Sequence, residues 1–181
     1  MSTREGQIIF DASSQDPKNR PKVTPRLLGA QEPLSQRIGF EFEITKPNEW
    51  ANAYMKVIGL KDKGRLDDWA KTLIVKAEDL STYQFLSIEI GAAGITQVKI
   101  ELQSEGNGID VQWAHPVKNL EVNTQLKPYK IPLSEFKQPD GNIPKRIATP
   151  DLLKKLTSVQ IGVSQVPAKG FIVVDNIAFE K

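Results

Sequence analysis

Hydrophobic and polar residues alternate in short segments along most of the chain. In residues 97–103 (QVKIELQ), Val98, Ile100 and Leu102 are separated by polar residues, and residues 38–44 (IGFEFEI) follow the same pattern. This alternation is typical of β-strands with one buried face. On this basis we expect strands over residues 7–11, 38–44, 71–77, 85–91, 97–103, 109–115, 127–133, 159–164 and 171–179.

Turn residues separate these segments, and helical signals are scarce. Residues 105–108 (EGNG) predict a hairpin loop between two strands. One short helix is expected over residues 149–156, with Thr149 as its cap and Pro150 at its first position. Residues 12–37 contain four prolines and many polar residues, and we interpret them as one long loop within a domain.

The number of strands predicts the class of fold. Roughly nine or ten strands with one clear face each, and at most one short helix, predict an all-β antiparallel sandwich or barrel. A length of 181 residues fits one domain of ordinary size. We therefore expect a single β-sandwich domain over residues 1–181.

Composition and charge exclude several classes of function. The 24 basic and 22 acidic residues are interspersed and leave a net charge of +2, so nothing favours a nucleic-acid partner. No apolar run approaches the roughly 20 residues that span a membrane. The chain has no cysteine and one histidine, which excludes disulfides, thiolate metal sites and a His-rich zinc site.

The sequence is compatible with two cellular locations. Residues 1–6 (MSTREG) contain no apolar core of a signal peptide. The protein is expected to be cytoplasmic if Met1 is the native start, and extracellular if the chain is a module excised from a longer protein.

Four segments carry a resemblance to a known family. Residues 77–88 (AEDLSTYQFLSI), 129–136 (YKIPLSEF), 156–163 (LTSVQIGV) and 171–179 (FIVVDNIAF) follow one another in the order seen in β-jelly-roll carbohydrate-binding modules. The chain thus resembles the galactose-binding-like jelly roll, and in particular the family-11-type modules. The complex I intermediate-associated protein domain is similar as well. The resemblance implies an antiparallel β-sandwich jelly roll that binds a polysaccharide without catalysing a reaction.

The residues of these segments also have a physical role in such a fold. Asp79 and Ser81 can form local hydrogen bonds that turn the chain into the following strand. Pro132 lacks an N–H group, which suits the end or edge of a strand. Leu133 and Phe136 can then fold back onto the core.

A polar sheet face is the expected ligand-binding site. If Val98, Ile100 and Leu102 face the core, the opposite face of that strand is polar. Aromatic rings stack on the apolar faces of sugars, and carboxylates and amides bond their hydroxyls. The resemblance implies a concave cleft on this face. The expected ligand-binding residues are Tyr54, Glu101, Gln103, Gln112, Trp50, Trp69 and Trp113.

Some of these residues have a second interpretation. Trp113 and His115 share a face with Ile109 and Val111, so a position at the edge of the core is open for both. Aromatic residues make up only 7% of the chain, which is low for a protein that binds polysaccharides.

A structural calcium ion is a further expectation from the resemblance. Such modules place Ca²⁺ between the first and last strands, with an acidic residue from each. Asp11 ends the first expected strand, and Asp175 lies in the last, on the same expected face as Val173 and Ile177. A buried carboxylate must be paired, hydrogen-bonded or bound to a metal, and Ca²⁺ prefers oxygen ligands. The alternative is that Asp175 accepts hydrogen bonds from backbone amides and binds no metal.

The sequence indicates no enzyme. Asp67, Asp68, Glu101 and Asp110 are candidate glycosidase carboxylates, but no spacing marks a pair. The chain has no Gly-rich phosphate loop, no G-x-S-x-G and no H-E-x-x-H motif. We therefore expect a non-catalytic protein.

A protein-interaction domain of the same fold is the alternative function. Like the complex I intermediate-associated protein domain, the chain would then act as a subunit or scaffold in a larger assembly. The low aromatic content and the absence of a visible signal peptide favour this alternative.

Overall fold

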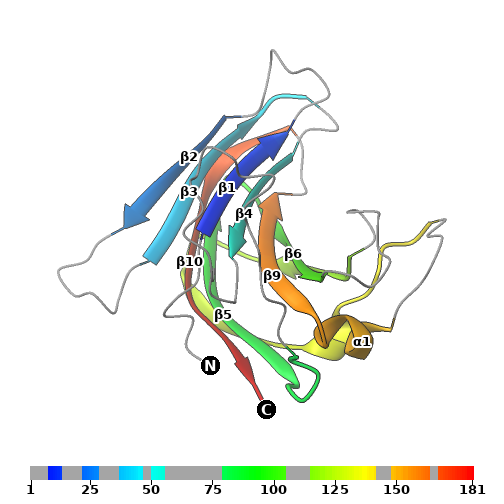
Figure 1. Ribbon diagram of the computed structural model, residues 1–181. Helices are drawn as coiled ribbons and strands as arrows, with labels where there is room; N and C mark the ends of the chain where they lie inside the picture. Colours follow the sequence, from blue (N-terminus) through cyan, green and yellow to red (C-terminus); the bar gives the residue numbers. More distant parts are fainter. Residues whose placement is uncertain are drawn as a thin grey trace, which may run out of the picture.

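The protein is a sandwich of two antiparallel sheets, as Figure 1 shows. Each sheet has five strands. The computed structural model describes residues 8–13, 22–28, 37–46, 50–55, 79–104, 115–141, 148–163 and 167–181. The strands of sheet A, in spatial order, are β1 (Ile8–Ser13), β4 (Trp50–Met55), β9 (Leu156–Val163), β6 (Gln97–Ser104) and β7 (Val117–Glu121). Those of sheet B are β2 (Lys22–Leu28), β3 (Arg37–Ile44), β10 (Ala168–Glu180), β5 (Phe85–Ala93) and β8 (Lys127–Pro132).

Most of the expected strands are present, and three further strands, β2, β4 and β7, lie outside the segments that we expected as strands. The all-β sandwich prediction is confirmed, and the alternating segments 38–44, 85–91 and 97–103 form β3, β5 and β6. The strand β2 lies inside the segment 12–37 that we interpreted as one loop. The expected strand 71–77, most of 109–115 and the hairpin loop 105–108 lie outside the described residues.

The core lies between the inner faces of the two sheets. Apolar side chains at every second position of β5 and β6 are 0–4% exposed. Burying one such side chain contributes about 1.5–3 kcal/mol. The core residues of the four central strands that are at most 1% exposed are Leu86, Ile88, Ile90, Val98, Ile100, Leu102, Leu156, Val159, Ile161 and Ile172.

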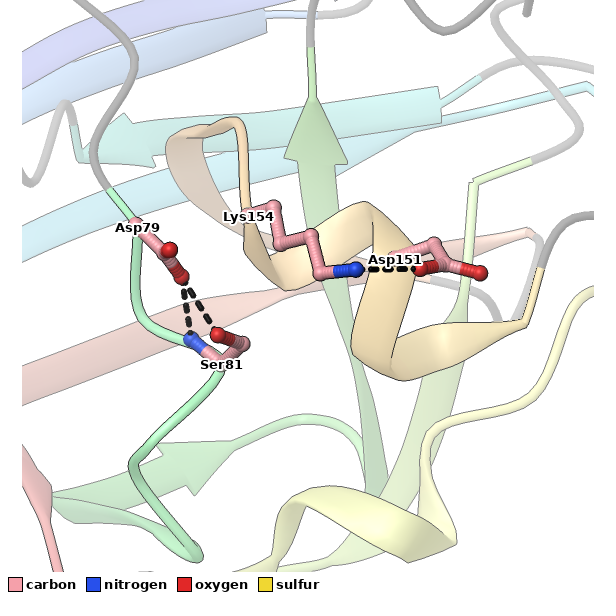
Figure 2. A network of polar contacts seen from close by, with 4 residues as sticks. All are labelled: Asp79, Ser81, Asp151 and Lys154. Carbon is pink, nitrogen blue, oxygen red and sulfur yellow. Dashed lines mark hydrogen bonds and ion pairs between the residues drawn. The ribbon is translucent and has the colours of Figure 1, made fainter.

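Local hydrogen bonds form in the turn before β5, as predicted. The Asp79 carboxylate accepts bonds from the Ser81 N–H at 2.9 Å and the Ser81 hydroxyl at 2.5 Å. These bonds hold the pKa of Asp79 below its ordinary value of 3.8. Between them, Leu80 is buried, and its N–H donates to the Leu153 carbonyl at 2.8 Å. Figure 2 shows this turn beside the helix α1 (Thr149–Leu153), next to the Lys154–Asp151 ion pair.

The chain after β8 also behaves as expected, except at the helix cap. Leu133 in the short 3₁₀-helix η3 (Leu133–Glu135) and Phe136 after it are both buried. The predicted role of Thr149 is wrong. The cap of α1 is Ala148, which makes no side-chain bond, while the Thr149 hydroxyl donates to the Phe136 carbonyl at 2.9 Å. The hydroxyl thus ties the start of the helix to η3.

Candidate ligand-binding face

Two neighbouring strands of sheet A place polar residues on the face that points away from the core. Along β6, Lys99, Glu101 and Gln103 alternate with buried apolar residues, and Ser158 and Gln160 do so along β9. Glu101 lies directly opposite Gln160, and Gln103 lies opposite Ser158. Directly paired residues share a face of the sheet, so these side chains meet on the outer face of sheet A.

A set of hydrogen bonds joins these side chains around Gln103. Its Nε2 donates to Gln160 Oε1 at 2.7 Å and to Glu101 Oε1 at 3.1 Å. The Ser158 hydroxyl donates to Gln103 Oε1 at 2.8 Å. Both ends of the Gln103 amide are therefore held. We call Glu101, Gln103, Ser158 and Gln160 the Gln103 network.

The network is mostly buried although it lies opposite the core. Ser158, Gln160 and Glu101 are 3%, 4% and 6% exposed, whereas Gln103 is half-buried. Lys99 Nζ lies 3.2 Å from Glu101 Oε2, and the Lys99 side chain is 34% exposed. Buried polar groups are stable only when they are bonded, so the mutual bonds fix the orientation of every member. Gln103 and Lys99 are the members of this arrangement that reach solvent most.

The single histidine lies next to this network. Leu102 N–H donates to the Pro116 carbonyl at 2.9 Å, and Glu101 pairs with Val117, so continuing this register sets His115 beside Gln103. His115 is 6% exposed, and its Nδ1 has no hydrogen-bond partner among the described residues. Burial lowers the pKa of His115 below 6.5, and the Glu101 carboxylate partly opposes this shift. His115 therefore belongs to the polar face rather than to the edge of the core.

The structure brings together some of the residues expected in the site. Glu101 and Gln103 are bonded to each other. The backbone of Tyr54 lies opposite Gln160, on the side of β9 away from β6, and Trp50 begins the same strand β4. The remaining expected ligand-binding residues, which lie outside the described residues, are Trp69, Gln112 and Trp113.

Two members of the network were not expected from the sequence. Ser158 and Gln160 alternate with Val159 and Ile161, which is the same signal that marked Glu101 and Gln103. The pattern therefore indicated their face. It did not indicate that β9 pairs with β6, because the strands are separated by more than 50 residues and pair through the fold.

The two aspartates of the calcium prediction, Asp11 and Asp175, come from different sheets. β1 lies in sheet A and β10 in sheet B. A β-bulge after Asp175, with Asn176 at a φ of 46°, places Asp175 on the outer face of sheet B, opposite to the buried Ile177. Our expectation that Asp175 shares a face with Ile177 is wrong for this reason.

The carboxylate of Asp175 makes a local hydrogen bond. It accepts the N–H of the next residue, Asn176, at 2.8 Å. Within the part of the chain that the structure describes, no three His, Asp or Glu side chains gather as metal ligands would. Nothing in the described residues tests whether calcium binds, so the calcium site at Asp11 and Asp175 stays a prediction.

Two hollows lie away from the Gln103 network. One, of about 460 Å³, is on sheet B and is lined by residues that include Glu41, Glu43, Lys169 and Phe171. The other, of about 520 Å³, is at the α1 end of the sandwich and is lined by residues that include Tyr83, Phe85 and Pro150. No helix among the described residues is long and apolar enough to cross a membrane.

The fold is that of the β-jelly-roll carbohydrate-binding modules, as the resemblance implied. No family model and no curated protein matches the sequence. The similarity is found instead among solved structures, at identities that establish the fold alone.

Three solved structures illustrate this similarity. A family 11 carbohydrate-binding module from Clostridium thermocellum, in complex with a β-1,3-1,4-mixed-linked tetrasaccharide, is 15% identical with a TM-score of 0.65, and 99% of this chain and 93% of that chain are covered. A family 30 carbohydrate-binding module is 13% identical with a TM-score of 0.57, covering 88% and 74%. An exo-β-agarase is 13% identical with a TM-score of 0.55, covering 96% of this chain but 23% of that chain.

Proposed function

We propose that the chain is a non-catalytic carbohydrate-binding module that binds a polysaccharide on the outer face of sheet A. The observation that carries the proposal is the Gln103 network. It fixes polar side chains on one sheet face of a fold that solved carbohydrate-binding modules share. Oriented polar groups and rings suffice for binding, whereas glycoside hydrolysis also needs two carboxyl groups at a set spacing.

The residues of this face divide into contacts and supports. Sugar hydroxyls both donate and accept hydrogen bonds, so an amide and an ammonium group can bind them. We assign contact with the ligand to Gln103 and Lys99, which are accessible. The buried Glu101 and Gln160 then act by holding Gln103 in place. Such prior orientation raises affinity because less freedom is lost on binding.

Aromatic stacking is the second part of the proposal. Tyr54 lies opposite Gln160 in register, so we assign the stacking ring to it. A stacked ring contributes about 0.5–1.5 kcal/mol beyond the area that it buries. The further contacts of the proposed site are Gln112, Trp50, Trp69 and Trp113.

A screen of soluble glycans tests the proposal. The intact chain is titrated with β- and α-glucans, xylans, mannans, galactans and the β-1,3-1,4-mixed-linked tetrasaccharide, with calcium and with a chelator. We expect saturable binding to one class of glycan. The calcium prediction is tested in the same titrations, by whether the chelator changes affinity or thermal unfolding. No binding by the folded protein would contradict the glycan proposal and favour a protein partner.

Two variants at one position then locate the site. Tyr54→Ala should weaken binding about threefold to tenfold, the range that corresponds to about 0.5–1.5 kcal/mol. Tyr54→Phe keeps the ring and should retain most of the affinity. Gln125→Ala, at an exposed turn residue between β7 and β8, is the control for nonspecific effects. If Tyr54→Ala binds as tightly as the unaltered chain, the site lies elsewhere, and the two hollows become the next candidates.

A further inference from the structure

The side chain of His115 is in an unusual position for an imidazole. It is 6% exposed, and its Nδ1 has no hydrogen-bond partner among the described residues. A buried nitrogen that has lost water without gaining a partner is costly, by about 1–3 kcal/mol. A rearrangement that gives His115 Nδ1 a hydrogen-bond partner would remove this cost.

Charged groups near His115 are few in the described part of the chain. On the same sheet face, β6 contributes Lys99 and Glu101, β7 contributes Glu121 at its far end, and the facing residues of β9 are uncharged. Glu101 is the charged group that acts on the imidazole. The natural partner of a protonated His115 is thus the Glu101 carboxylate.

We propose that His115 and Glu101 form a proton-operated switch that controls the orientation of Gln103. When His115 takes a proton from solvent, its imidazolium N–H donates to the Glu101 carboxylate. The carboxylate oxygen that now accepts from Gln103 then turns to the imidazolium, and the Gln103 amide is released on that side. Loss of the proton restores the bond between Gln103 and Glu101.

The hydrogen-bond lengths support this order of events. Gln103 Nε2 lies 3.1 Å from Glu101 but 2.7 Å from Gln160, so the bond to Glu101 is the longer one. A bond between an imidazolium and a carboxylate is charge-assisted on both sides and is stronger than one from a neutral amide. Lys99 contacts the other carboxylate oxygen, Oε2, and can stay in place. Burial lowers the pKa of His115, so the switch operates below pH 6.5.

The switch has a consequence for binding that rests on the proposed function. Gln103 is the contact residue that we assign to the glycan, so its release should weaken binding in acid. By linkage, the factor by which protonation weakens glycan binding equals the factor by which bound glycan weakens protonation. The glycan should therefore lower the pKa of His115.

The switch itself can be tested without any glycan, because the chain has one histidine. In ¹⁵N-labelled protein, the imidazole signals belong to His115 alone and report its pKa directly. Between pH 7.5 and 4.5, the side-chain amide signals of Gln103 should change with the midpoint of His115. In Glu101→Gln the midpoint should move to lower pH, and the response of Gln103 at that midpoint should disappear. A Gln103 amide that does not follow the His115 titration would overturn the switch.

The link to binding is tested with the glycan found in the screen. Affinity should be about fivefold or more weaker at pH 5 than at pH 7.5, within the usual range of coupling between sites. His115→Asn, which cannot take up a proton, should abolish this difference. Glycan binding with equal pH dependence in His115→Asn would overturn the link to His115 but leave the proposed function intact. A chain that binds no glycan contradicts the proposed function, while the amide titration still decides whether the switch exists.

Discussion

The outer faces of the two sheets hold their charges in different ways. On sheet A, Glu101 is buried, and its carboxylate is bound by Gln103 and Lys99. On sheet B, Lys169 lies 3.3 Å from Glu43, with 75% and 42% of their side chains exposed. An exposed pair of this kind contributes about 0–1 kcal/mol, because water competes for both partners. Buried groups instead depend on one another, since each loses water that only its partners replace.

The difference between the faces separates a candidate site from an ordinary surface. The Lys169–Glu43 pair of sheet B is exposed to water. The Gln103 network has one arrangement, held by bonds from two strands. A ligand that meets it finds its hydrogen-bonding groups already oriented, which is the property expected of a binding face.

The largest expected effect concerns the centre of the network. Gln103→Ala removes the partner of Ser158, of Gln160 and of one Glu101 oxygen, all three of which are buried. It should lower the free energy of unfolding by about 2–3 kcal/mol, because buried polar groups would lose their partner. Urea unfolding measures the change.

The matched control is the same substitution at an exposed position. Gln125→Ala changes a residue in the turn between β7 and β8, and it should alter the free energy of unfolding by less than about 0.5 kcal/mol. Equal effects of the two substitutions would remove the distinction between the buried network and the surface.

The second effect is a response of stability to mild acid. The folded pKa of His115 is below 6.5, so the unfolded chain binds more protons than the folded chain as the pH falls past 6.5. Stability should therefore be full above pH 6.5 and decrease toward the folded pKa of His115. The loss amounts to about 1.4 kcal/mol for each unit by which folding lowers the pKa.

Sheet B should respond only at lower pH. Lys130 and Ser87 hold the pKa of Glu180 below its ordinary value of 4.5, so its contribution is full above that pH and is lost as the pH falls through its folded pKa. The change in thermal stability between pH 7 and 5 therefore reports the contribution of the buried His115 without that of Glu180. The decrease over this range should be absent in His115→Asn, and a decrease of equal size in that variant would assign it to other groups.

The alternation of hydrophobic and polar residues predicted most strands and which side chains face away from the core. It did not predict which strands pair with each other. Strict alternation placed Glu101 and Gln103 opposite the core correctly. The strand β2 was not predicted, because Pro25 and the polar residues around it are typical of loops. An edge strand such as β2 nevertheless tolerates proline. A one-residue bulge reversed the face of Asp175 relative to Ile177, which no simple period can predict.

The environment of His115 could not be predicted for a different reason. In the alternating pattern, His115 shares a face with Ile109 and Val111, which allowed a position in the core. Only the pairing of β6 with β7 places His115 near Glu101. A pKa shift depends on which charge lies nearby and on how much water is excluded. Both are properties of the folded packing rather than of the local sequence.

The smallest expected effect compares one ion pair from each face. A double-mutant cycle at Lys99 and Glu101 should give a coupling energy of about 1 kcal/mol, because Glu101 is 7% exposed and Lys99 34%. The cycle at Lys169 and Glu43 should give less than about 0.5 kcal/mol. Adding 1 M salt should abolish the coupling at the exposed pair, since the screening length falls to about 3 Å. The buried pair should retain most of its coupling, and equal salt sensitivity at both pairs would mean that water reaches Glu101 as freely as Glu43.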